Sequence, residues 1–135
     1  MAPTLTVGTK VLPGYPMPVG EKLLIVFDRT GPTSYTSWVA STQTGGDVIT
    51  LGGLGPLNQG GIDYFDADGA DTTGQIQIFP VFPLGGFGNA VKAVTLVYYS
   101  LVTATLGGQA QTANAQIVAA TNLSTFSWRL RGLLV

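Results

Sequence analysis

Paired glycines and scattered prolines interrupt this chain so often that there is little room for helices before residue 90. Glycine reaches positive φ without steric cost, and proline breaks a helix because it lacks an amide hydrogen. Pairs of this kind mark the turns between strands. The pattern therefore predicts short strands joined by glycine turns. The glycine pairs are Gly45-Gly46, Gly52-Gly53, Gly60-Gly61, Gly85-Gly86 and Gly107-Gly108, and the prolines stand at positions 3, 13, 16, 18, 32, 56, 80 and 83.

Several stretches between these breaks have the composition of strands. Residues 22–28 form a continuous apolar run, which predicts a strand buried on both faces. Residues 34–41 and 47–51 are rich in β-formers. In residues 75–79 the alternation places Ile76 and Ile78 on one face. Residues 91–105 predict a long central strand, which Gly107-Gly108 can turn into a hairpin.

The end of the chain gives the clearest strand signal. In residues 124–131 the apolar Phe126, Trp128 and Leu130 alternate with polar residues, which is typical of a half-buried antiparallel strand. Residues 109–120 fit either a strand or an alanine-rich helical stripe, and flanking turn signals favour the strand. Seven or eight such strands predict an all-β fold: a single antiparallel sandwich, jelly-roll-like domain or barrel.

The first twenty residues are expected to form an extended arm, with the β domain covering residues 21–135. The segment PGYPMP at residues 13–18 favours extended, polyproline-like backbone. Such an arm cannot form a core of its own. We expect it either to lie across a neighbouring molecule or to cross its own domain.

The absence of two residue types restricts the chemistry. The 135-residue chain has no cysteine and no histidine, which excludes disulfides, thiolate metal sites and the usual general base. A serine triad of the ordinary kind cannot be built. Four of the seven acids fall in the one acidic cluster described below, and Glu21 and Asp28 stand alone, so paired-carboxylate glycoside hydrolysis is not expected either. We predict that the protein is not an enzyme.

Charge is sparse, with six basic and seven acidic residues and none between residues 93 and 128. Charged residues make up 10% of the chain, whereas about a quarter is usual. Such sparse charge favours a homo-oligomer or a docked protein, and the alternative is a well-buried β core with a surface of Thr, Ser, Gln and Asn. No basic stripe predicts nucleic-acid binding, and no apolar run is long enough for a membrane span. Residues 1–4 lack a secretory pattern, so we expect synthesis in a cytoplasm.

One acidic segment is a candidate calcium site. Four aspartates are closely spaced around a glycine, and calcium prefers carboxylate and carbonyl oxygens. The order of an EF-hand is absent, and a solvated turn is the alternative interpretation. The four residues are Asp63, Asp66, Asp68 and Asp71.

Three segments are candidate interfaces. Residues 79–88 hold three phenylalanines and two prolines, which fits either an interface anchor or a loop covering the end of the core. The apolar carboxyl end favours docking, within the domain or onto a neighbour. The proline-rich arm is the third. The candidate contact residues are Pro13, Tyr15, Pro16, Met17, Pro18, Phe79, Phe82, Phe87 and Leu134.

A small, weakly charged β domain without cysteine or histidine, rich in Thr, Gly and Ala and preceded by a proline-rich arm, resembles the cement or decoration proteins of tailed-phage capsids. That resemblance implies a protein on the outer capsid surface that stabilises neighbouring subunits. It also implies that the partners are the major capsid protein or other virion subunits, and that a homotrimer is favoured. Tail-tube, head–tail joining and fibre domains share this composition. The alternatives of other classes are a calcium-assisted carbohydrate-binding or adhesin module and, last, a hydrolase using Asp66 or Asp68.

Overall fold

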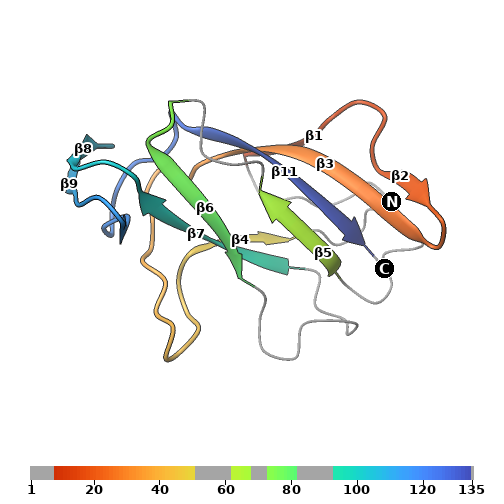
Figure 1. Ribbon diagram of the computed structural model, residues 1–135, viewed down its shortest axis with the longest axis horizontal. Coiled ribbons are helices and arrows are strands. Elements are labelled where there is room, and N and C mark those ends of the chain that lie inside the picture. Colours follow the sequence, from red (N-terminus) through yellow and green to blue (C-terminus); the bar gives the residue numbers. More distant parts are fainter. Residues whose placement is uncertain (1–7, 51–61, 68–72, 82–92, 135) are drawn as a thin grey trace.

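The computed structural model describes residues 8–50, 62–67, 73–81 and 93–134 (Figure 1). All regular elements in these ranges are strands, so the expected all-β class is confirmed. The strands are β1 (Thr9–Val11), β2 (Met17–Val19), β3 (Lys22–Thr30), β4 (Asp47–Thr50), β5 (Ile62–Ala67), β6 (Ile76–Val81), β7 (Ala93–Ser100), β8 (Ala104–Leu106), β9 (Gln109–Gln111), β10 (Ala115–Gln116) and β11 (Ser127–Leu134).

The first sheet is built around β3. Strand β11 pairs with β3 in antiparallel register from Ser127 opposite Thr30 to Leu134 opposite Leu23, and β5 pairs with the other edge of β11. On the free edge of β3, β1 lies beside one end and β2 beside the other. Strands β1 and β2 therefore form one interrupted edge strand (Figure 1).

The second sheet is built around β7. Strand β6 pairs with residues 95–100 of β7, whereas β4 pairs with residues 93–96 and β10 with residues 99–100. Because a strand has only two edges, β4 and β10 share the edge opposite β6. A separate hairpin joins β8 to β9 through Gly107 and Gly108, which have φ values of 58° and 82°. This is the hairpin that the glycine pair predicts, and two positive φ angles are typical of a tight primed turn.

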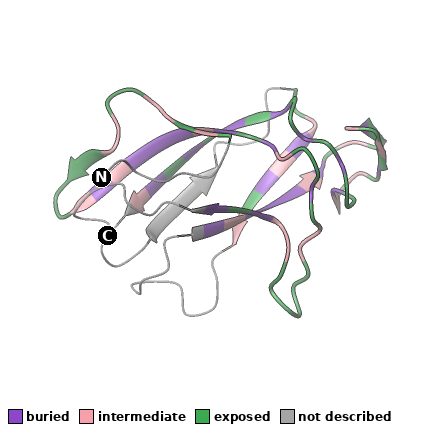
Figure 2. Ribbon diagram, turned by 180° about the vertical axis from the view of Figure 1, so that it is seen from behind, coloured by how far each residue is buried: buried purple, intermediate pink, exposed green. Residues whose placement is uncertain are grey.

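The two sheets enclose one apolar core, as in a β-sandwich. Inward-pointing side chains of β3, β6, β7 and β11 fill this core, and Figure 2 shows the buried stretches along β3, β7 and β11. Ile76 and Ile78 both lie in this core, as do Trp128 and Leu130, so the period-two predictions for these strands are confirmed. On β3 the inward face is buried, while on the outer face Val26 is buried and Leu24 and Asp28 are only half-buried. The prediction that β3 is buried on both faces therefore holds for the inner face and only in part for the outer face.

Two predicted strands differ from the structure. Residues 34–41 form no strand beyond a single bridge between Val39 and Thr44. The reason is that Tyr35 enters the core and exchanges backbone hydrogen bonds with residues 120 and 121, which holds this segment as a connection between layers. The long strand expected over residues 91–105 ends at Ser100. There the Ser100 hydroxyl donates to the carbonyl of Val102 and accepts from its amide, forming a local turn instead of continuing the ladder.

Residues 109–120 contain two short strands and no helix, so the predicted preference for strand is confirmed. The first of these strands is β9, and the second, β10, contributes to the edge of the second sheet. Inside this segment Ile117 is fully buried. The alanines that suggested a helical stripe therefore lie in strands and the connections between them.

The described part of the expected arm belongs to the sandwich. Residues 9–11 and 17–19 pair with β3, and the Leu12 amide donates to the carbonyl of Val26 at 2.9 Å. The chain leaves the sheet only briefly between the two strands, where the Tyr15–Pro16 peptide is cis. Of the two expectations for the arm, crossing its own domain holds for residues 9–19. Residues 1–7 lie outside the described ranges.

Candidate functional site

The candidate calcium residues do not share one loop. Asp63 and Asp66 belong to β5, and the backbone of Asp66 lies opposite that of Arg131 in β11. Over residues 63–67 the acidic segment is therefore a strand and neither a loop nor a solvated turn, because the β-formers around these aspartates extend the first sheet. Asp68 and Asp71 lie outside the described residues, and calcium binding stays a prediction.

The candidate interface residues do not form one surface. In residues 13–19, called the edge segment from here on, Pro13, Met17 and Pro18 are exposed, while Tyr15 and Pro16 are half-buried.

Phe79 lies far along the chain on β6 and is 48% exposed. Phe82 and Phe87 fall outside the described residues. Leu134 ends β11, with its backbone opposite Leu23 on one side and Ile62 on the other, so the carboxyl end docks within its own domain as far as residue 134.

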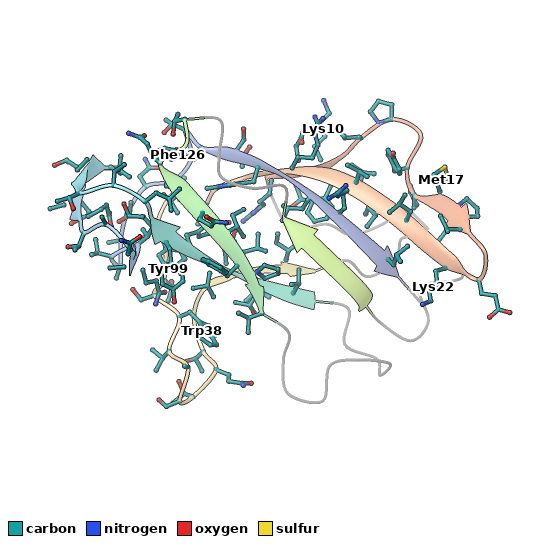
Figure 3. The ribbon with its side chains drawn as sticks, viewed as in Figure 1. Lys10, Met17, Lys22, Trp38, Tyr99 and Phe126 are labelled. Carbon is teal, nitrogen blue, oxygen red and sulfur yellow. The ribbon has the colours of Figure 1, made fainter. Side chains whose placement is uncertain are left out.

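Phe79 forms part of a groove that the sequence did not predict. Because Ile76 and Ile78 point into the core, Gln77 and Phe79 project from the opposite, outer face of β6. Tyr99 projects beside them from β7, and Trp38 comes from the connection between β3 and β4 (Figure 3). The groove has a volume of about 420 Å³. We call it the aromatic groove.

The lining of the aromatic groove is uncharged throughout the described residues. The rings of Phe79 and Tyr99 meet edge to face, with centroids 5.2 Å apart and planes at 87°. Two amide side chains, Gln77 and Asn114, also line the groove. Asn114 has φ of 63°, a left-handed conformation that Asn tolerates well, and its backbone N–H donates to the carbonyl oxygen of Ser100 at 2.8 Å.

Trp38 is held in place through its backbone. Its amide donates to Oε1 of Gln116 at 2.6 Å, and Nε2 of Gln116 donates to its carbonyl oxygen at 3.1 Å. The hydroxyl of Tyr35 donates to the same Oε1 at 2.7 Å. One glutamine side chain thereby fixes both polar backbone groups of the residue that forms a wall of the aromatic groove, and a buried tyrosine fixes the glutamine.

A buried polar network is connected to Gln116 through Tyr35. Arg29 of β3 binds Asp47 of β4 through two hydrogen bonds, Nε to Oδ2 at 2.9 Å and Nη2 to Oδ1 at 2.6 Å. Tyr98 of β7 donates its hydroxyl to the same Oδ2. The backbone amide of Tyr98 donates to the Tyr35 hydroxyl at 3.4 Å. The network thus runs from the first sheet to the second and reaches the tyrosine that anchors Gln116.

Aromatic packing seals this network from solvent. Tyr98 stacks on Trp128 with ring centroids 4.7 Å apart and meets Tyr35 edge to face at 5.4 Å. Arg29 is 3% exposed, Asp47 is 6% exposed and Tyr98 is fully buried. Nε1 of Trp128 is also buried, and the described residues offer it no hydrogen-bond partner.

Burial and charge shift the ionisation of the network in a consistent direction. Burial raises the pKa of Tyr35 to about 12, and it raises the pKa of Tyr98 well above its usual value, with the negative charge of Asp47 adding to the effect. For Arg29, burial acts to lower the pKa, but the hydrogen bonds and charge of Asp47 outweigh it, so the pKa is raised. The neutral tyrosines and the charged guanidinium are therefore the favoured forms.

These features give the two regions different roles. The Arg29–Asp47–Tyr98 network is buried and holds β3, β4 and β7 together. The aromatic groove is open and offers ring surfaces and amide groups, a set suited to binding. Sequence reasoning missed the network because Arg29 and Asp47 are 18 residues apart. The available signal was a charged residue on the inward face of an apolar strand, which requires a buried partner.

An exposed ion pair contrasts with the buried one. Asp28, which the sequence analysis treats as isolated, accepts hydrogen bonds from Nε and Nη2 of Arg129 at 3.0 and 3.3 Å. The two side chains are 38% and 54% exposed. The pair links β3 to β11 on the solvent face of the first sheet, where it contributes little to stability.

Comparison with protein-family models, with curated proteins and with solved structures gives no match for this chain. Within the described ranges, the structure has no helix of the length and hydropathy needed to cross a membrane.

Proposed function

We propose that this chain is a non-catalytic structural protein of a virion, of the capsid cement or decoration type. In this role it binds the outer capsid surface and stabilises neighbouring subunits after synthesis in the host cytoplasm. The observation that carries the proposal is the apolar, exposed edge of the first sheet. Every residue of β2 is exposed, with Met17 at 41% and Val19 at 47% (Figure 2).

The edge segment fits a contact made by side chains. Prolines at positions 16 and 18 remove backbone donors, which disfavours addition of a further strand. The exposed apolar side chains beside them gain free energy when a neighbouring subunit covers them. The low charge of the whole chain supports the same conclusion, because few like charges oppose close packing of copies.

Other exposed apolar side chains broaden the surface that neighbours can cover. They occur on the second sheet and on the connections, and a decoration protein that clamps several subunits needs more than one contact. They are Val39, Val48, Phe79, Leu101 and Val118. Another virion position, in a tail tube, head–tail joint or fibre, would use the same surface properties, so the partner is either the major capsid protein or another virion subunit.

Light scattering across a concentration series tests the assembly part of this proposal. We expect a homotrimer of the 14.0 kDa chain. The double substitution Met17→Ser and Val19→Ser should raise the dissociation constant at least tenfold, whereas Ala104→Ser, at an exposed position of β8 outside these contact residues, should leave it unchanged. A strict monomer at all concentrations would contradict the homo-oligomer.

Sedimentation with empty capsid shells of the encoding virus tests the partner. The wild-type chain should sediment with the shells in a saturable amount, and the Met17→Ser/Val19→Ser chain should stay in the supernatant. Absence of binding to shells that lack the protein would exclude the decoration role and leave the other virion positions.

A further inference from the structure

The aromatic groove has the dimensions of a ligand site. Its volume of about 420 Å³ lies within the range of about 300–1,000 Å³ that is usual for small-molecule pockets. It lies on the outer face of β6 and β7, and the core is on the opposite face of the same strands. A ligand can therefore enter without any rearrangement of the sandwich.

The groove combines two kinds of chemical group. Trp38, Phe79 and Tyr99 supply aromatic surface, and Phe79 keeps 48% of its surface exposed. Gln77 and Asn114 supply amides, each of which carries both donors and an acceptor. The structure shows no hydrogen bond from either amide side chain to another described residue. These two amides are thus available to a ligand.

This combination selects the chemical class of the ligand. A charged ligand requires opposite charge, and no described lining residue carries any. A purely apolar ligand would bury the two amides without partners, at a cost of about 1–3 kcal/mol for each unsatisfied group. A sugar chain satisfies both requirements, because its C–H faces pack on aromatic rings while its hydroxyls donate to and accept from amides.

The groove is also organised before any ligand arrives. Gln116 holds the amide and carbonyl of Trp38 at 2.6 and 3.1 Å, and Tyr35 holds Gln116 from the buried side. Binding therefore does not have to order the backbone of Trp38, which preserves affinity.

We propose that the aromatic groove is a binding site for neutral oligosaccharides. Trp38 and Tyr99 provide the stacking surfaces, and Gln77 and Asn114 recognise hydroxyl groups. The site is separate from the β2 edge, so the molecule can hold a neighbour with one surface and a glycan with the other.

Isothermal titration calorimetry with cellohexaose, maltohexaose, mannohexaose and chitohexaose tests the proposal. At least one should bind saturably, and Trp38→Ala or Gln77→Ala should weaken that binding at least tenfold, equivalent to about 1.4 kcal/mol. Asn114→Gly should weaken it too, since glycine keeps the left-handed backbone while removing the amide. Val39→Ala and Gln109→Ala are matched controls outside the groove and should bind as the wild type does.

Three results would overturn the proposal. The first is no binding of any of the four hexasaccharides at millimolar concentration by a chain whose urea transition shows it to be folded. The second is tighter binding of a sulfated hexasaccharide than of every neutral one. The third is a shift of the solution mass by Gln77→Ala, which would show that another copy occupies the groove. Because the β2 variants test self-association separately, failure here and failure of the decoration role are distinguishable.

Discussion

Removal of the Asp47 carboxylate should destabilise the fold more than any surface change. The variant Asp47→Leu deprives Arg29, which is 3% exposed, of both hydrogen bonds to its carboxylate partner. Breaking a buried ion pair on one side costs about 3–5 kcal/mol. Tyr98 also loses the acceptor of its hydroxyl, which adds about 1–3 kcal/mol. The total, roughly 4–8 kcal/mol, is a large share of the roughly 5–15 kcal/mol by which domains are stable.

Urea unfolding followed by circular dichroism measures this effect. Small proteins lose about 1–3 kcal/mol of stability per molar urea, so the midpoint should fall by more than about 1 M. The control is Asp28→Leu, which removes the same kind of carboxylate from an Arg partner at an exposed site and should change stability by less than about 1 kcal/mol.

A triple variant separates the loss of a partner from the loss of the network. In Arg29→Met/Asp47→Leu/Tyr98→Phe no polar member of the network remains unpaired, so the triple variant should be at least about 2 kcal/mol more stable than Asp47→Leu alone. The reasoning is refuted if Asp47→Leu resembles Asp28→Leu, or if the triple variant is no more stable than the single one.

Three further predictions concern the same framework. Burial raises the pKa of Tyr35 from 10.0 to about 12, so the unfolded chain releases this proton at a lower pH than the folded chain does. The free energy of unfolding should therefore fall by about 2–3 kcal/mol between pH 10 and pH 12. Urea titrations across this range should show a smaller fall for Tyr35→Phe. Gly107→Ala should destabilise the chain by at least about 1 kcal/mol more than Gly108→Ala. Both glycines have positive φ, but only at Gly107 would an added Cβ overlap a neighbouring carbonyl, that of Asn122. Equal thermal unfolding midpoints for the two variants would argue against this. Gln116→Ala removes three hydrogen bonds, two of them to Trp38, and should cost about 2–4 kcal/mol in urea while weakening glycan binding, with Gln109→Ala unchanged in both.

The alternation of apolar and polar residues predicted the strands that have one buried face and one solvent-exposed face. The alternation around Ile76 and around Trp128 identified inward faces correctly, because a strand at a sandwich surface buries every second residue. Gly107-Gly108 identified its hairpin for an equally local reason, the positive φ that the turn requires. These signals depend on neighbours in sequence, so a single chain contains them.

The features that the sequence could not predict depend on partners far apart along the chain. Residues 34–41 have the composition of a strand, but Tyr35 fills the core instead, and Trp38 lines the same groove as Tyr99 of β7. Gln116 is 78 residues away from the tryptophan that it holds. The aromatic groove is assembled from four separate segments of the chain, so only the three-dimensional arrangement reveals it.

Nuclear magnetic resonance of the two tryptophan indoles tests the central claim most directly, because one indole lines the aromatic groove and the other is buried in the core. Titration with the best-binding neutral hexasaccharide should shift the Nε1–H resonance of Trp38 and leave that of Trp128 unmoved. If both resonances stay in place at saturating ligand, or if only Trp128 responds, the aromatic groove is not the binding site.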